Sequence, residues 1–343
     1  MIISKTPYRI SFFGGGSDYP SWYIRNGGAV LSTTIDKYIY ISCRYLPPFF
    51  EHKYRIVWSQ MENVKAINEI KHRAVKEISQ IKHKAVRKML KYYKIKDGLE
   101  IHYDGDLPAR SGMGSSSVFV VGLMNLLNNF QGKKIKKKIL AQKSIYFEQK
   151  ILKDVVGSQD QLAATYGGFN KITFKTEGGF NVHPISIKKE TLDKLNRNLL
   201  LVYTGIKRTA HDIAKGYINK LHKSKKSHIL QIISLAGEAE KTLRKGDVNN
   251  FGKLLHESWL EKKSLSSSIT NSSIDEIYNN AINKGALGGK LLGAGGGGFF
   301  LFYVPYFKHK NFIKHFRKLI TIPFKFSSEG STILFKNIDK KII

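Results

Sequence analysis

One stretch of the sequence combines residues suited to holding a phosphate group. Pro108–Ser117 reads Pro-Ala-Arg-Ser-Gly-Met-Gly-Ser-Ser-Ser, so a glycine-rich turn leads into a segment of helical character. Glycines allow a backbone to approach a bulky anion, and the first amides of a helix point at that anion. Serine hydroxyls can bind phosphate oxygens or a metal ion. An ordinary helix start capped by serine is the alternative, and the Gly-Lys-Ser/Thr ending of a Walker A loop is absent.

A second glycine-rich stretch, Lys290–Phe300, leads into an expected strand. It contains the spacing Gly-x-Gly-x-x-Gly at Gly293, Gly295 and Gly298. A dinucleotide-binding fingerprint needs a strand before its glycines and a helix after them, so we reject that interpretation. A long flexible turn is the simplest alternative. The high glycine content favours instead close packing of the backbone against a ligand or another loop.

The third stretch, Pro7–Pro20, is an expected strand that ends in three glycines followed by Ser17 and Asp18. Arg9 has apolar neighbours on this strand, so its charge is expected to need a partner. Asp18 is suited to accept hydrogen bonds from sugar hydroxyls. A tight turn with a structural salt bridge explains the same residues equally well, and the spacing alone leaves both interpretations open.

Two carboxylates, Glu148 and Asp160, stand twelve residues apart. Glu148 falls on an expected helix, and Asp160 falls at the start of the next one, within Gly157–Gly168. Phosphoryl transfer needs a carboxylate that holds Mg²⁺ and a group that orients or deprotonates the nucleophile. A solvated surface charge is the alternative for either residue.

The elements that must position these residues follow from hydrophobic periodicity. Residues 1–60 have the character of strands and turns, with a half-buried strand at Ile35–Ser42. Helices are expected at residues 62–95, 118–127, 135–153, 160–166, 209–222, 227–245, 248–263, 273–284 and 308–320. Further strands are expected at residues 99–103, 169–187, 199–204, 298–304, 324–326 and 332–335. A boundary is expected near residues 170–197, where charged residues and weak strands separate two mixed segments.

Length and composition indicate a folded protein of two domains. The chain has 343 residues, of which 42% are apolar, and it contains one cysteine. That cysteine, Cys43, excludes an internal disulfide and fits a reducing cytoplasm. No apolar stretch is long enough to span a membrane, and Met1–Ser11 has no signal-peptide core. A cytoplasmic protein is therefore expected.

The formal net charge of +31 has three possible explanations. A nucleic-acid binder would show basic clusters with exposed stacking aromatics, and an enzyme for anionic substrates would gain from a positive field near its cleft. The third explanation is a general preference for lysine. Lysine is spread along the whole chain, with local runs at Lys133–Lys138 and Lys223–Lys226, which favours this third explanation. Of the other two we prefer the anionic substrate, and we expect no nucleic-acid partner and no membrane partner.

Together the three glycine-rich stretches resemble the motifs of the GHMP kinases (galactokinase, homoserine, mevalonate and phosphomevalonate kinases), in the family's order. Pro7–Asp18 is similar to the N-terminal substrate motif, and Lys290–Phe299 to the C-terminal glycine motif. Pro108–Ser117 is similar to the phosphate loop, with Met113 where leucine is usual. The resemblance covers nearly the whole chain. It implies an α+β fold with a ribosomal-protein-like α/β domain at residues 1–185, which binds ATP and substrate, and a ferredoxin-like domain at residues 186–343.

The resemblance also implies roles for particular residues. Asp160 would be the catalytic carboxylate, as in the galactokinase Asp-Gln motif, and Arg9 would stabilise the reacting hydroxyl and the transferring phosphate. Glu148 and Ser116 would hold Mg²⁺. The implied ATP-binding residues are Gly112, Met113, Gly114, Ser115, Ser116 and Ser117, with Val57, Trp58 and Ser59 at the adenine. The implied substrate-binding residues are Gly14, Gly15, Gly16, Ser17, Asp18, Gly168 and Arg208, with Lys207 beside Arg208 as a further clamp for a substrate phosphate.

Within the family, the form of the first motif distinguishes subgroups. Gly14–Gly16 stands where galactokinases have Gly-Glu-His, which argues against galactose as the substrate. The chain resembles the bacterial kinases of D-glycero-D-manno-heptose 7-phosphate, which phosphorylate the anomeric hydroxyl and supply nucleotide-activated heptose for surface polysaccharide. Fucokinase-like relatives share the signature, and a non-catalytic sugar sensor and an RNA-binding protein are alternatives of other classes. The resemblance implies ATP and a sugar phosphate as partners, with the chain as a monomer or homodimer.

Overall fold

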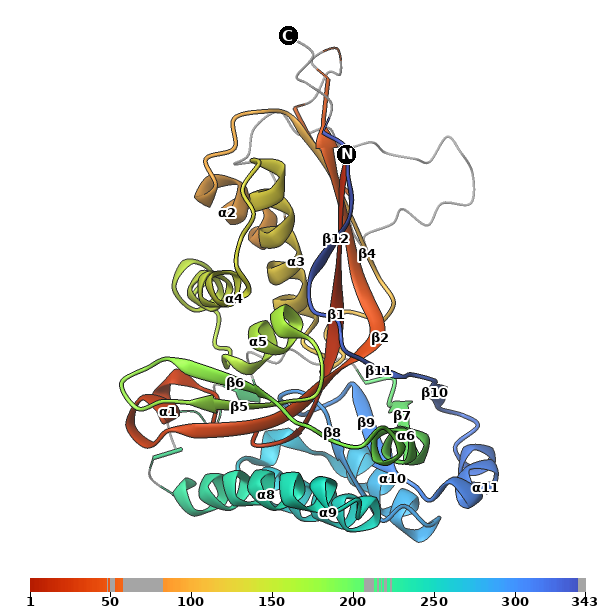
Figure 1. Cartoon of the computed structure of the whole chain (residues 1–343). Helices are drawn as coiled ribbons and strands as arrows, with labels where there is room; N and C mark the ends of the chain where they lie inside the picture. The colour runs from red at the N-terminus through yellow and green to blue at the C-terminus, as the bar shows by residue number, and fades with distance from the viewer. Residues whose placement is uncertain are drawn as a thin grey trace.

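The computed structural model describes residues 1–47, 49, 53–57, 83–206, 213, 214, 216, 218, 221, 222 and 224–338. In this part of the chain the strands form two sheets (Figure 1). The larger sheet has the order β12-β1-β2-β4-β3, with β11 and β5 also paired to β2 and β6 paired to β5. The smaller sheet has the order β10-β7-β9-β8.

The larger sheet is built on the antiparallel pair of β1 (Ile2–Phe13) and β2 (Gly28–Tyr45). Its other strands are β3 (Tyr54–Val57), β4 (Leu99–Gly105), β5 (Asn170–Phe174), β6 (Phe180–Pro184), β11 (Phe326–Ser327) and β12 (Thr332–Lys336). The chain thus returns at its end to the sheet in which it began, because β12 pairs with β1 and β11 pairs with β2. The division after residue 185 stays a prediction, and this pairing assigns β11 and β12 to the first sheet.

The side chains of β1 alternate between the hydrophobic core and the opposite face of the sheet. Tyr8, Ile10 and Phe12 are 0% exposed and belong to the hydrophobic core. Because successive side chains of a strand point to opposite faces, Arg9 and Ser11 lie together on the other face. The pairing with β2 is regular from Arg9 to Ser11, so no bulge interrupts this alternation.

Helices cover one side of the larger sheet (Figure 1). They are α2 (Lys84–Tyr92), α3 (Ser115–Phe130), α4 (Lys137–Tyr146), a short π-helix (Phe147–Leu152) and α5 (Gln159–Tyr166). Helix α3 is apolar on nearly all sides and packs against β1 and β2, as a helix at the centre of a core does. A short helix, α1 (Pro20–Asn26), connects β1 to β2.

The smaller sheet contains β7 (Leu199–Tyr203), β8 (Gly288–Leu291), β9 (Phe299–Tyr303) and β10 (Ile320–Ile322). The helices of this half are α6 (Lys189–Asn198), α8 (Lys226–Arg244), α9 (Val248–Lys263), α10 (Ser272–Asn283) and α11 (His309–His315). Every residue of β9 is buried, and α9 packs against β8 and β9. Helix α8 lies beside α9 and also contacts β1 and β2, so it joins the two halves (Figure 1).

Several sequence-based expectations need correction. The helix expected at residues 308–320 ends at His315, because the chain then turns into β10. The strand expected at residues 324–326 is wrong, since β10 lies before it and β11 begins at its last residue. The expectations missed α1, α6 and β8, and the helices expected at 62–95 and 209–222 lie largely outside the described residues. No helix in the described ranges is long and apolar enough to cross a membrane.

Candidate active site

The phosphate loop is positioned by glycines and by the start of α3. Gly112 and Gly114 have φ angles of 80° and 75°, in the left-handed region that glycine tolerates. Gly114 is the N-cap of α3. The backbone amides of Ser115, Ser116 and Ser117, in the first turn of the helix, therefore have no hydrogen-bond acceptor within it. This arrangement matches the expected anion-binding helix start.

The C-terminal glycine stretch packs backbone against backbone on this loop. A Cβ atom added to Gly112 would lie 2.5 Å from the Leu292 carbonyl oxygen, and one added to Gly293 would lie 2.5 Å from the Gly112 Cα. A Cβ on Gly298 would lie 2.2 Å from the Ser111 carbonyl oxygen. The expectation of close packing against another loop is therefore confirmed.

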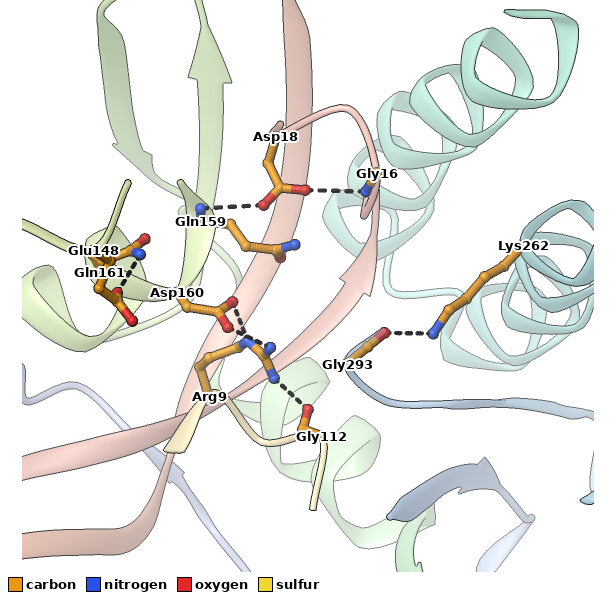
Figure 2. A network of polar contacts seen from close by, with 10 residues as sticks. All are labelled: Arg9, Gly16, Asp18, Gly112, Glu148, Gln159, Asp160, Gln161, Lys262 and Gly293. Atoms are coloured by element: carbon orange, nitrogen blue, oxygen red, sulfur yellow. Dashed lines mark hydrogen bonds and ion pairs between the residues drawn. The ribbon is translucent and has the colours of Figure 1, made fainter. Parts of the chain in front are cut away.

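Arg9 connects β1 to both the phosphate loop and α5. Its Nε donates to Oδ1 of Asp160 at 2.7 Å and its Nη2 donates to Oδ2 at 2.8 Å, which makes a bidentate ion pair. Its Nη1 donates to the Gly112 carbonyl oxygen at 2.9 Å (Figure 2). Only 4% of the Arg9 side chain is exposed, against 23% for Asp160. Arg9 thus has the partner that its apolar surroundings led us to expect.

The ion pair lies directly against the helix start. A Cβ atom on Gly114 would lie 3.0 Å from Oδ2 of Asp160 and 3.4 Å from Cζ of Arg9. A phosphate at the first amides of α3 would therefore be next to both a guanidinium and a carboxylate. This juxtaposition suits transfer of a phosphoryl group to a hydroxyl bound at that carboxylate.

Asp18 is buried beside this pair and ties the substrate loop to α5. Its carboxylate accepts hydrogen bonds from the backbone N–H of Gly16 at 3.0 Å and from the backbone N–H of Gln159 at 3.3 Å (Figure 2). A Cβ atom on Gly157 would lie 1.8 Å from Asp18 Oδ2, so the two segments touch. Burial raises the pKa of Asp18 to about 6, and the nearby Asp160 acts in the same direction.

We expect this carboxyl group to make the stability of the ligand-free protein depend on pH. The folded-state pKa of about 6 lies above the reference value of 3.8, so the folded state holds the proton more tightly. The resulting stabilisation is complete below pH ~4 and is lost as the pH rises through ~6, by about 3 kcal/mol. Urea unfolding of wild type and Asp18→Asn at several pH values in this range measures how the free energy of unfolding changes with pH in each protein. An equal change in the two proteins would contradict this assignment.

Glu148 lies at the π-helix, where it is fully buried next to the phosphate loop. Its Oε1 accepts a hydrogen bond from Ser116 Oγ at 3.2 Å, and its Oε2 accepts one from the side-chain amide of Gln161. Burial raises the pKa of Glu148 to about 7. The structure thus brings Glu148 and Ser116 together as expected.

The donor atoms of this pair fit Mg²⁺. A carboxylate and a hydroxyl are hard oxygen ligands, and Mg²⁺ in kinases commonly takes one or two carboxylates while substrate phosphates supply further oxygens. No group of three or more histidine, cysteine or acidic residues in the described ranges could hold a metal by itself. A metal here would therefore depend on the phosphates of the nucleotide.

The sequence interpretation gave no role to two buried lysines at the site. Lys290 Nζ donates to the Phe12 carbonyl oxygen at 2.7 Å, and Lys262 Nζ donates to the carbonyl oxygens of Leu291 and Gly293 at 2.6 and 2.7 Å. Burial lowers the pKa of Lys290 to about 7, and it also lowers the pKa of Lys262. Neither lysine has a carboxylate partner among the described ion pairs; Lys290 ties the glycine stretch to β1, and Lys262 ties it to α9.

The remaining residues predicted to bind ATP or substrate have different surroundings, and some lie outside the described residues. Met113 is 0% exposed and belongs to the hydrophobic core, and Ser117 is also buried. The Gly168 amide donates to Thr34 Oγ1 at 2.8 Å, in the turn after α5. Val57 is exposed at the end of β3. The predicted Trp58, Ser59, Lys207 and Arg208 lie outside the described residues.

Comparison with known proteins identifies the family and supports the fold. The family model for the GHMP kinases N terminal domain matches residues 80–168, and the model for GHMP kinases C terminal matches residues 239–316. A D-glycero-alpha-D-manno-heptose 7-phosphate kinase from Campylobacter jejuni is 31% identical over 338 residues, which cover 96% of this chain and 97% of that protein.

Two solved structures share the whole architecture. A sugar kinase from Campylobacter jejuni is 28% identical, with a TM-score of 0.71 and 97% of each chain covered. A D-glycero-D-manno-heptose 1-phosphate kinase from Bacteroides thetaiotaomicron is 23% identical, with a TM-score of 0.77, and the match covers 98% of this chain and 100% of that one.

Fold and site together define a phosphotransferase for small molecules. The chain belongs to the GHMP kinase family and is a sugar kinase.

Proposed function

We propose that this kinase transfers the γ-phosphate of ATP to the anomeric hydroxyl of D-glycero-D-manno-heptose 7-phosphate, giving the 1,7-bisphosphate for nucleotide-heptose and surface polysaccharide synthesis. The observation that carries the reaction type is the Arg9–Asp160 ion pair, which is bonded at the same time to the phosphate loop at Gly112. The Campylobacter jejuni heptose 7-phosphate kinase, similar over nearly the whole chain, supports the choice of sugar.

Asp160 and Arg9 have complementary parts in this proposal. The Asp160 oxygens keep lone pairs beyond those used by Arg9, so one of them accepts the proton of the sugar hydroxyl or holds that hydroxyl in line with the phosphate. A loose phosphoryl-transfer transition state needs little help from a base, so orientation is the larger part of this role. Arg9 offsets negative charge on the transferring group, and the first amides of α3 bind the phosphates of ATP.

The residues proposed to hold Mg²⁺ are Glu148 and Ser116, together with oxygens of the nucleotide. When bound, the ion would neutralise charge on the phosphates. We further propose Gly14–Asp18 as the loop that surrounds the sugar. Lys207 and Arg208 stay proposed partners of the phosphate at carbon 7. The buried thiol of Cys43 agrees with a cytoplasmic protein, and we propose a monomer or a homodimer.

A panel of acceptors tests the proposal. ADP release is measured with ATP and Mg²⁺ against heptose 7-phosphate, unphosphorylated heptose, fucose, mannose, galactose and mannose 6-phosphate. We expect turnover with heptose 7-phosphate and far less with every other sugar. Turnover on fucose in preference would support the fucokinase-like alternative. No turnover on any sugar, with ATP still bound, would support the non-catalytic sensor.

A further inference from the structure

Among the buried polar atoms near the ion pair that have no hydrogen-bond partner, two lie on side chains that face each other across Gly15. Within the part of the chain that is described, Ser11 Oγ and Gln159 Oε1 are both unpaired. Ser11 is 6% exposed and Gln159 is 9% exposed, so solvent reaches neither of them freely. Leaving such a group unpaired costs roughly 1–3 kcal/mol, and buried polar groups are rarely without a partner. These two atoms therefore need an explanation.

Both side chains converge on Gly15. A Cβ atom added to Gly15 would lie 3.7 Å from Gln159 Nε2 and 3.8 Å from Ser11 Oγ. Gly14 and Gly16 have positive φ angles of 84° and 102°, but Gly15 is not among the residues with positive φ. The backbone at Gly15 therefore does not require glycine. A side chain at this position would instead occupy the space between the two polar side chains.

This place adjoins the groups proposed to carry out the reaction. Gln159 directly precedes Asp160, and its side chain lies between the carboxylates of Asp18 and Asp160 in the view of Figure 2. Ser11 follows Arg9 by two residues on the same face of β1, a separation of about 7 Å along a strand. A sugar whose hydroxyl meets Asp160 and Arg9 would therefore lie beside Ser11 and Gln159.

The chemistry of the two side chains matches a hydroxyl group. The serine hydroxyl can donate or accept a hydrogen bond, and the amide oxygen of glutamine accepts one. A single alcohol group held between the two side chains could accept from Ser11 Oγ and donate to Gln159 Oε1, which would pair both atoms. A second unpaired hydroxyl, Ser32 Oγ, belongs to the residue paired with Ser11 across β1 and β2, so a further buried polar group lies beside Ser11.

We propose that Ser11 and Gln159 form a binding site for one sugar hydroxyl, on the carbon next to the hydroxyl that receives the phosphate, and thereby help to select the acceptor. The inference rests on the proposed function. For a heptose 7-phosphate, the hydroxyl that this site binds is the one on carbon 2.

The test combines variants with a substrate that lacks this hydroxyl. Ser11→Ala and Gln159→Leu are compared with wild type on heptose 7-phosphate and on its 2-deoxy analogue. We expect kcat/KM with the natural sugar to fall roughly tenfold to a hundredfold in each variant, because the hydroxyl loses a buried partner. With the 2-deoxy sugar the same variants should differ from wild type by less than about threefold, since no bond remains to be lost.

Ser4→Ala is the matched control. Ser4 also lies on β1 and its Oγ is also buried and unpaired, but it pairs with Ile41 and Ile333 at the far end of the strand. It should leave kcat/KM unchanged for both sugars. If Ser11→Ala and Gln159→Leu lower kcat/KM equally for both sugars, the two atoms serve the fold or hold a water molecule, and the proposal is overturned.

Calorimetry separates this inference from the proposed reaction. Binding of the two sugars to wild type and variants is measured without ATP, so the same comparison is obtained even if no phosphate is transferred. A 2-hydroxyl effect that disappears in the variants would support the subsite whatever the catalytic result. Heptose binding that does not depend on the 2-hydroxyl would overturn it.

Discussion

Replacing Asp160 by asparagine should lower kcat by ~10²–10⁴-fold while the protein remains folded. The variant loses the negative charge proposed to orient the hydroxyl. It also leaves Arg9, whose side chain is 4% exposed, without a carboxylate. We therefore expect a loss of about 1–3 kcal/mol in the free energy of unfolding as well, moderated because Asp160 is partly solvated. Steady-state kinetics with saturating ATP and sugar measure the first effect, and urea unfolding measures the second.

Asp154→Asn is the control for this experiment. Asp154 pairs with Lys84 at 3.0 Å on the surface, and 30% of its side chain is exposed. Loss of such a surface pair is worth little, so kcat and stability should stay near those of wild type. Folded Asp160→Asn protein that turns over within about tenfold of wild type would remove Asp160 from its proposed role.

Gly112→Ala should weaken nucleotide binding strongly, because the added methyl group would collide with the second glycine-rich loop. The methyl group would lie 2.5 Å from the Leu292 carbonyl oxygen, which belongs to backbone that cannot rotate away. One of the two loops must then move, at a cost of about 1–3 kcal/mol of stability that is typical of overpacking. Because this loop is proposed to hold the phosphates of ATP, we expect its displacement to raise the KM for ATP more than about tenfold, as steady-state kinetics would measure.

Gly132→Ala separates the effect of the contact from that of backbone strain. Gly132 has a φ of 76°, close to the 80° of Gly112, but a Cβ atom there would meet nothing within 4 Å. Both variants share the strain of an L residue in the left-handed region, about 1–2 kcal/mol. Equal effects of the two substitutions on the KM for ATP would show that contact between the loops does not position the phosphates.

Some parts of the site could be predicted because they depend on local sequence. Glycine-rich turns and the helix start after Gly114 follow from residue type, and the apolar neighbours of Arg9 indicate a charge that needs a partner. The identity of that partner could not be predicted from periodicity, because Asp160 lies 151 residues away in the sequence. Only the resemblance to the GHMP kinases connected the two residues before the structure did.

Other parts could not be predicted because they depend on tertiary packing. Lys262 and Lys263 are adjacent at the end of α9, and nothing in the sequence shows that Lys262, which is 8% exposed, is the buried one. The strand β11 is only two residues long, so its alternation of side chains is too short to detect in the sequence. Its partner β2 lies near the other end of the sequence. Helix α6 was missed because its charged composition conceals an apolar side formed mainly by Leu192 and Leu195.

The central claim is that the chain phosphorylates the anomeric hydroxyl of a sugar that already carries a phosphate. Phosphorus NMR of the reaction of ATP, Mg²⁺ and D-glycero-D-manno-heptose 7-phosphate tests it most directly. We predict a product with a second phosphate at carbon 1, formed in equal amount to ADP. ADP formed without a new sugar phosphate, or a new phosphate on any other carbon, would contradict the claim.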